Sequence, residues 1–345
     1  MGYAHRGWIV ARTGLDLALT FVLTVAGLIV ITFVIGRFLP TDPVVAIIGD
    51  RAPHDVYVAT RIAMGLDKPI WVQLARYAGR LLTGDFGTSV LSSQPVLDDL
   101  GRFFPATLEL ATVSSVVAVI VGVPLGVVAA VKERTWFDHV IRVVALIGYS
   151  VPVFWLGLVG LLVFYARLDW VAGPGRIDIA YQYSIPPVTG MALIDTLLAG
   201  DLDAFRSVVS HMLLPVGILG LYSMAYITRM TRSFMLEQLS AEYVTTARVK
   251  GLREGRVVWR HAFANIAAPL VTVIALAYAN LLSGSVLTET IFAWPGVGLY
   301  ITQSLFSADL NAVLGGTIVI GVCYIAINLL ADALGRVLDP RMRAT

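Results

Sequence analysis

The chain has 345 residues, of which 57% are hydrophobic and 14% are charged. Soluble proteins carry about 25% charged residues, so this composition excludes a water-soluble globular protein, and a formal net charge of +2 gives no basis for binding nucleic acid. The single cysteine, Cys323, excludes an intramolecular disulfide and a zinc site built from cysteines. The composition therefore predicts an all-α membrane protein that crosses the bilayer several times.

Six stretches of 18 to 28 residues contain no Asp, Glu, Lys or Arg. Because about 20 apolar residues cross a bilayer as a helix, each stretch is long enough for one transmembrane helix. The first is too long for the core of a signal peptide and is expected to remain as an anchor. Pro124, Pro152 and Pro215 are expected to kink their helices. The six predicted helices are 17–36, 110–131, 143–166, 211–228, 261–288 and 310–331.

The basic residues are distributed unevenly between the two sides of these helices. Fifteen of the 25 Lys and Arg residues fall at the N-terminus, in 132–142, in 229–260 and at the C-terminus. The other ten are spread over longer segments on the opposite side. Since short cytoplasmic loops carry an excess of Lys and Arg, both termini are predicted to be cytoplasmic.

Two long polar segments, 37–108 and 167–210, are then expected outside the cytoplasm. The first alternates short amphipathic stretches with Pro and Gly and reads as a small folded cap, whereas turns dominate the first half of the second. Loops of this length often bind or gate something, and a plain packing role is an equal alternative.

The segment 229–260 is basic and has a helical pattern. Within it, residues 241–250 read as a short helix, and Gly251 follows where a left-handed C-cap needs glycine. Such a helix suits insertion into a groove of a partner protein. A basic helix lying on anionic lipid headgroups fits the same pattern, so the residues alone leave both open.

Several separated blocks of the sequence form a recognisable series. They are Met64–Pro69, Gly84–Ser89, Pro105–Ala111, Glu242–Leu252 with His261, Asn265 and Pro269–Thr272, then Thr288–Gly298 and Leu338–Arg341. Together these blocks resemble the inner-membrane permease subunits of ABC importers, in the dipeptide, oligopeptide and nickel branch. Two departures are present: Thr245-Thr246-Ala247 stands where the wider superfamily has Glu-Ala-Ala, and Pro40-Thr41-Asp42-Pro43 replaces Pro-Gly-Asp-Pro.

The resemblance implies a type I ABC importer permease fold with six transmembrane helices. It divides the chain into 1–104, an N-terminal transmembrane helix with an extracytoplasmic cap, and 105–345, a five-helix core with a coupling helix near 242–252. The implied location is the bacterial inner membrane. The implied partners are a homologous second permease, two ATP-binding subunits and an extracytoplasmic solute-binding protein, in addition to the lipid bilayer.

The chain is expected to be a non-catalytic subunit. It contains no phosphate-binding Gly-x-x-x-x-Gly-Lys-[Ser/Thr] motif, so ATP and Mg would bind the partner subunits, with no cofactor in this chain. Its five histidines show no metal-ligand spacing. The expected substrates are di- or oligopeptides, and nickel complexes or another small solute such as an oligosaccharide are the alternatives. A secondary transporter is disfavoured because the predicted helices lack Asp, Glu, Lys and Arg.

Glu109 and Glu289, at the ends of predicted helices, are expected to reach water. Gly122 and Gly126 are expected to allow close helix packing.

The resemblance and the polar pattern together define three groups of site residues. Residues expected to couple to the ATPases are Glu242, Tyr243, Thr246, Ala247, Arg248, Lys250, Gly251 and Leu252. Polar residues that could line a translocation path, or only bond between helices, are Tyr222, Ser223, Tyr226, Asn280, Ser283, Ser285 and Asn328. Residues for an extracytoplasmic gate or docking surface are Trp294, Pro295, Gly296 and Gly298.

Overall fold

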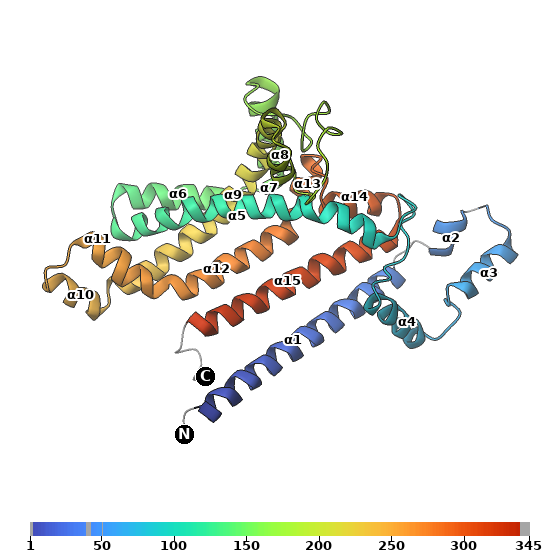
Figure 1. Cartoon of the computed structure of the whole chain (residues 1–345), viewed down its shortest axis with the longest axis horizontal. Helices are drawn as coiled ribbons and strands as arrows, with labels where there is room; N and C mark the ends of the chain where they lie inside the picture. The colour runs from blue at the N-terminus through green and yellow to red at the C-terminus, as the bar shows by residue number, and fades with distance from the viewer. Residues whose placement is uncertain (1–2, 39–42, 50, 339–345) are drawn as a thin grey trace. The chain divides into compact units, whose positions relative to one another are not determined.

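The structure is a computed structural model that describes residues 3–38, 43–49 and 51–338 (Figure 1). Over these ranges all repetitive structure is helical and no β-strand is present, which confirms the predicted all-α class. Two of the sequence blocks, 40–43 and 338–341, fall largely outside the described residues. The helices are α1 Tyr3–Phe38, α2 Pro43–Ile48, α3 His54–Ala63, α4 Ile70–Leu82, α5 Val96–Val131, α6 Trp136–Ser150, α7 Val153–Gly160, η1 Leu161–Arg167, α8 Ala192–Ala199, α9 Leu202–Leu239, α10 Glu242–Val249, α11 Glu254–Arg256, η2 Val257–Ala262, α12 Phe263–Gly284, α13 Val286–Ile291, α14 Val297–Phe306 and α15 Leu310–Leu338.

Five described helical segments are long and apolar enough to cross a membrane. They contain the first, second, fourth and sixth predicted helices and most of the fifth. A sixth crossing is formed if α6 and the continuous pair α7–η1 are counted together. The structure therefore matches five of the six predicted crossings directly, and it matches all six when the bent pair is counted as one broken crossing. The five segments are Leu15–Arg37, Val96–Val131, Leu202–Leu239, Glu254–Gly284 and Leu310–Gly335.

The predicted third helix, 143–166, is not a single straight helix. α6 and α7–η1 meet at an angle of 96°. The break lies at Val151, which has an extended backbone (φ −81°, ψ 130°), and at Pro152. Proline lacks an amide hydrogen and disfavours helical geometry in the residue before it, so Pro152 breaks the helix here. By contrast, α5 continues through Pro124 and α9 continues through Pro215.

The predicted fifth helix also ends earlier than its charge-free stretch suggests. α12 stops at Gly284 and the short α13 starts at Val286. The last four residues of the predicted helix, 285–288, therefore belong to the junction and to α13. This correction matters for Ser285 and Glu289, which lie beyond the long helix.

The chain divides by its internal contacts into two compact units. Unit 1 comprises residues 1–104 and 296–326, and unit 2 comprises residues 105–295 and 327–345. In unit 1, Val96, Val297 and Tyr300 form part of an apolar cluster, and the ring of Phe103 stacks on Tyr300 at 5.0 Å. The buried carboxylate of Asp309 accepts hydrogen bonds from the Ser89 hydroxyl and the Leu91 amide, which fixes the loop before α5 to the start of α15.

In unit 2, α9 packs closely against α5. The Thr228 hydroxyl donates to the Gly122 carbonyl at 3.1 Å. A Cβ atom at Gly126 would lie only 2.7 Å from the Thr228 carbonyl oxygen and 2.6 Å from the Thr231 Cβ. The structure therefore confirms that Gly122 and Gly126 permit a close helix approach.

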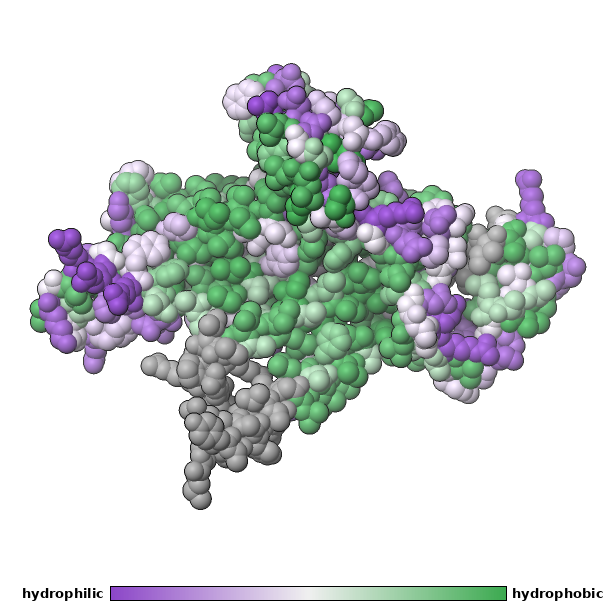
Figure 2. Space-filling model, in the orientation of Figure 1, coloured by the Kyte–Doolittle hydropathy of each residue, from purple (hydrophilic) through white to green (hydrophobic). Residues whose placement is uncertain are grey.

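Figure 2 shows hydrophobic residues over the long helices and hydrophilic residues gathered around α10 and α11. Many of the exposed apolar side chains belong to helices that qualify as membrane crossings, including Leu23 of α1 and Ile120 of α5. In a membrane such surfaces contact lipid or another subunit. α10 and α11 lie between α9 and α12 (Figure 1), outside the apolar surface.

Candidate functional site: α10 and the buried polar network

The C-terminus of α10 has the backbone geometry that the sequence predicts. Gly251 has φ +76°, the left-handed region that glycine adopts without strain. Its amide donates to the Arg248 carbonyl at 2.9 Å, and the Leu252 amide donates to the Ala247 carbonyl at 3.3 Å. These two bonds form a Schellman motif, which satisfies helix carbonyls that would otherwise lack donors. The end of α10 is thus fixed locally by the glycine.

One face of α10 is buried and the other is exposed. Val244 and Ala247 are buried in a cluster with Met235 of α9, Val257 of η2 and Ile266 of α12, and the partly buried Leu252 packs against this cluster. The remaining predicted coupling residues form the exposed face. The spacing of three between Val244 and Ala247 gives α10 one apolar stripe, and Val244 is a buried contact that the site prediction did not include. Exposed are Glu242, Tyr243, Thr246, Arg248, Lys250 and Gly251.

The Tyr243 hydroxyl joins α10 to both neighbouring long helices. It donates to Gln238 Oε1 of α9 at 2.8 Å and accepts from Asn265 Nδ2 of α12 at 3.0 Å. On the same face, Arg248 forms an ion pair with Glu254 of α11 at 2.6 Å. Arg248 donates hydrogen bonds to the Glu254 carboxylate, and these bonds raise the pKa of the guanidinium above its ordinary value. These contacts would therefore transmit a displacement of α10 to α9, α11 and α12.

The seven predicted path residues do not share one environment. Ser223 is buried, Asn280 is exposed, and Ser283 bonds to carbonyls of its own helix at 3.3 Å. Ser285 is buried and donates to Glu289 Oε1 at 2.8 Å. Asn328 is half-buried. Bonding within the protein thus accounts for Ser283 and Ser285, while the role of all seven in transport stays a prediction.

Tyr222 and Tyr226 of α9 lie beside an aromatic and cationic group. The Tyr222 ring stacks on Tyr149 of α6 at 5.4 Å. The Arg229 guanidinium lies 5.3 Å from the Tyr149 ring centroid and 5.8 Å from that of Tyr226. These four residues bring the middle of α9 against the end of α6.

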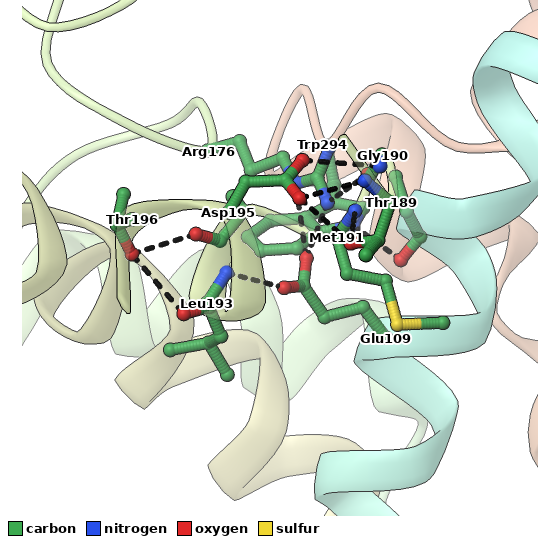
Figure 3. A network of polar contacts seen from close by, with 11 residues as sticks. Glu109, Arg176, Thr189, Gly190, Met191, Leu193, Asp195, Thr196 and Trp294 are labelled. Carbon is green, nitrogen blue, oxygen red and sulfur yellow. Dashed lines mark hydrogen bonds and ion pairs between the residues drawn. The ribbon is translucent and has the colours of Figure 1, made fainter. Parts of the chain in front are cut away.

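Glu109 and Glu289 are buried, which corrects the prediction that both reach water. Glu109 is 3% exposed and Glu289 is fully buried. Glu109, on α5, accepts hydrogen bonds from Arg176 through Nε at 3.0 Å and through Nη2, and from the Leu193 amide of α8 at 2.7 Å (Figure 3). Arg176 also donates to the Gly190 carbonyl at 2.7 Å. A buried carboxylate is stable here because a cation and an amide replace the water it has lost.

The same network fixes the loop between η1 and α8. Asp195 of α8 accepts from the amide and hydroxyl of Thr189, both at 2.8 Å, and from the Gly190 amide at 3.0 Å. The Gly175 amide donates to the Phe292 carbonyl at 2.7 Å. The loop is therefore tied to α5 and α8 (Figure 3), and the Gly175 bond ties it to the end of α13.

The predicted gate or docking residues are mostly inside the protein. Trp294 is completely buried, its Nε1 donates to the Ala106 carbonyl at 2.9 Å, and its ring lies 5.6 Å from Arg176. Gly296 and Gly298 are buried and Pro295 is half-buried. The structure gives Trp294 a packing role, and a role of these residues in gating or docking stays a prediction.

Comparison with known proteins places these features in a family. Residues 122–344 match the profile of the family described as "Binding-protein-dependent transport system inner membrane component". The probable D,D-dipeptide transport system permease protein DdpB of Escherichia coli K12 is 43% identical over 323 residues, which cover 93% of this chain and 94% of that protein. The dipeptide transport system permease protein DppB of the same strain is 41% identical and covers 97% and 98%.

Two further similarities extend the comparison. The di/tripeptide transport system permease protein DppB of Pseudomonas aeruginosa UCBPP-PA14 is 40% identical, covering 93% of this chain and 95% of that protein. Among solved structures, a chain of the inward-facing MetNI methionine ABC transporter matches 70% of this chain and 96% of its own length, with a TM-score of 0.52 and 16% identity. This likeness confirms the predicted ABC importer permease fold.

Proposed function

We propose that this chain is the permease subunit of an ATP-driven importer for di- or oligopeptides. The chain belongs to the family of binding-protein-dependent transport system inner membrane components, which is the basis of this proposal. The observation that carries this proposal is 40 to 43% identity, over more than nine-tenths of the chain, to permeases named for dipeptide or di/tripeptide transport. A multi-pass membrane subunit of this kind forms part of the transport path and does not itself need a catalytic site.

The rest of the machine would be supplied by partner subunits. The sequence has no phosphate-binding loop, which supports a role for two separate ATP-binding subunits that hold ATP and Mg. A homologous second permease would complete the path, and a solute-binding protein would deliver the peptide. The excess of Lys and Arg in 132–142, 229–260 and the terminal segments supports a cytoplasmic location for both termini and for α10.

In this assembly α10 would be the coupling helix that contacts the ATP-binding subunits and transmits their movement to the membrane helices. Its exposed face, from Glu242 to Lys250, would sit in a groove of an ATP-binding subunit. Its buried face is packed into the cluster that includes Met235 and Ile266, so a push on α10 would move α9 and α12 together. The Tyr243 hydroxyl and the Arg248–Glu254 pair support this role, because they bond α10 to its neighbours.

The substrate path and the docking surface are proposed from the remaining residues. Polar side chains at Tyr222, Ser223, Tyr226, Asn280 and Asn328, with Ser283 and Ser285, would line the path. The loop between η1 and α8 and the segment before α5 would face the binding protein.

Reconstitution tests the proposal. The chain is co-expressed with a candidate second permease, ATPases and binding protein, and the purified complex is placed in liposomes. ATP-dependent uptake of labelled dipeptides, tripeptides, nickel complexes and oligosaccharides is then compared. Peptide uptake that requires the ATPases supports the proposal. Uptake restricted to nickel complexes or oligosaccharides, or an active complex that contains no ATPase, overturns it.

A further inference from the structure

A groove of about 550 Å³ lies between α6 and α9 in unit 2. Its size is that of a small-ligand site. Its walls combine guanidinium groups with apolar and aromatic side chains, and it is separate from α10 and from the network of Glu109. The lining includes Arg142, Val143, Leu146 and Tyr149 of α6, and Arg229 and Arg232 of α9.

The groove carries more positive charge than its carboxylate neutralises. Asp138 is 1% exposed and accepts from Arg232 Nε at 2.7 Å and Nη2 at 2.9 Å. Arg142 lies 3.8 Å from the same carboxylate. Arg229 forms no ion pair with any acidic residue in the described part of the chain, and the rings of Tyr149 and Tyr226 hold it instead. Three arginines thus line the groove, and the one aspartate beside it contacts only Arg232 and Arg142, which leaves a formal net charge of about +2.

The neighbouring residues place this charge near a membrane interface. Trp136, at the first turn of α6, is 65% exposed, and Lys132 lies over the adjacent Phe137 ring at 4.0 Å. Exposed tryptophan beside basic residues is typical of the headgroup level. Arg142 follows Trp136 by six residues, about 9 Å along a helix. Val143 and Leu146 continue the groove with exposed apolar side chains.

We infer that this groove binds the phosphate of an anionic phospholipid, with Arg229 and Arg142 as its cations and Val143 and Leu146 against the acyl chain. Planar guanidinium groups hold phosphate oxygens through paired hydrogen bonds. Basic pockets between membrane helices near an interface bind anionic headgroups for this reason. A cation at the border of the hydrocarbon is stabilised by an anion that pairs with it. A resident lipid supplies one, whereas a transported substrate is present only in passing.

The test is a lipid titration of the full chain in its purified complex, followed by native mass spectrometry. The probes are dioleoylphosphatidylglycerol and dioleoylphosphatidylcholine. We expect the first phosphatidylglycerol to bind about 25-fold more tightly than phosphatidylcholine, since two unneutralised arginines each contribute roughly fivefold. Arg229→Gln should weaken it about fivefold, and Arg142→Gln with Arg229→Gln about 25-fold. Arg134→Gln is the matched control, because Arg134 has an 89% exposed side chain near the same interface but does not line the groove.

Four results would overturn the lipid site. The first is equal affinity for the two lipids, and the second is an equal loss in the Arg134→Gln and Arg229→Gln proteins. The third is release of bound phosphatidylglycerol by millimolar inorganic phosphate or by dialanine, which would make the ligand a free anion or a peptide carboxylate. The fourth is loss of the second permease from the Arg229→Gln complex with phosphatidylglycerol affinity unchanged, which would assign Arg229 to a partner carboxylate. Such a site requires only that the chain spans a membrane. A negative result for lipid binding would therefore leave the proposed peptide transport untouched, and the reverse also holds.

Discussion

The ion pair between Glu109 and Arg176 should control the local stability of the loop that precedes α8. Substituting Glu109→Gln keeps the shape and an acceptor oxygen for the Leu193 amide but removes the charge opposite Arg176. Loss of one partner from a buried pair costs about 3–5 kcal/mol. Because 16% of the Arg176 side chain is exposed, water compensates in part, and about 2–3 kcal/mol is expected.

Hydrogen exchange at the Leu193 amide measures this loss, since that amide donates directly to Glu109. A loss of 2–3 kcal/mol should accelerate exchange roughly 30- to 150-fold. Arg176→Met should give a similar acceleration. The double variant should be much less destabilised than the sum of the two single variants, because each removes the same interaction.

The exposed pair Arg206–Asp203 on α9 is the matched control, with side chains 77% and 71% exposed. Asp203→Asn should change the exchange of the neighbouring amides by less than about threefold, since exposed pairs contribute only a few tenths of a kcal/mol. The explanation is refuted if Glu109→Gln leaves Leu193 exchange within that same range, or if the two single effects simply add.

Three further substitutions test the packing of unit 2 and the α10 segment. Gly126→Ala should lower stability by about 1–3 kcal/mol, because its Cβ would meet Thr231 at 2.6 Å, whereas Gly217→Ala, with no atom within 4 Å, should leave the melting temperature unchanged in detergent. Gly251→Val should strain the left-handed backbone by roughly 1–2 kcal/mol and reduce substrate-stimulated ATPase activity. Gly251→Asn should retain this activity, because asparagine tolerates the left-handed conformation. Equal ATPase activities of the two variants would contradict a role for the backbone turn. Tyr243→Phe should leave the fold intact and lower transport per ATP hydrolysed, measured in proteoliposomes, and an unchanged ratio would remove the hydroxyl from the coupling mechanism.

Local and periodic features of this chain could be predicted from its sequence. Charge-free stretches of sufficient length identify membrane helices because lipid excludes unpaired charge. The left-handed Gly251 is also predictable, since its conformation depends on the helix end that it follows. The small residues Gly122 and Gly126 indicate close packing for a similarly local reason, although not which helix approaches them.

Pairings between distant residues could not be predicted in this way. Glu109 and Arg176 are 67 positions apart, and Arg176 lies in a loop rich in glycine and proline with no periodic pattern. A glutamate at the end of an apolar stretch fits an exposed boundary position equally well, so its burial follows only from the tertiary structure. The end of α12 at Gly284 was missed for a related reason, because the apolar residues beyond it continue into the separate helix α13.

The break at Pro152 decides the parity of the membrane crossings. α6 has 15 residues and α7 with η1 has another 15, so each limb measures about 22 Å and is shorter than a bilayer core of about 30 Å. An N-terminus and a C-terminus on one side require an even number of crossings, and five of the crossings come from long helices. With both termini on one side, as the distribution of Lys and Arg predicts, the bent pair would carry the chain across the membrane as an elbow. If the pair turned back instead, every segment after Pro152, α10 included, would change sides relative to the N-terminus. Reporter fusions after Arg134 and after Arg167 would therefore show whether these two points lie on opposite sides of the membrane. That result fixes the side on which the whole C-terminal half begins.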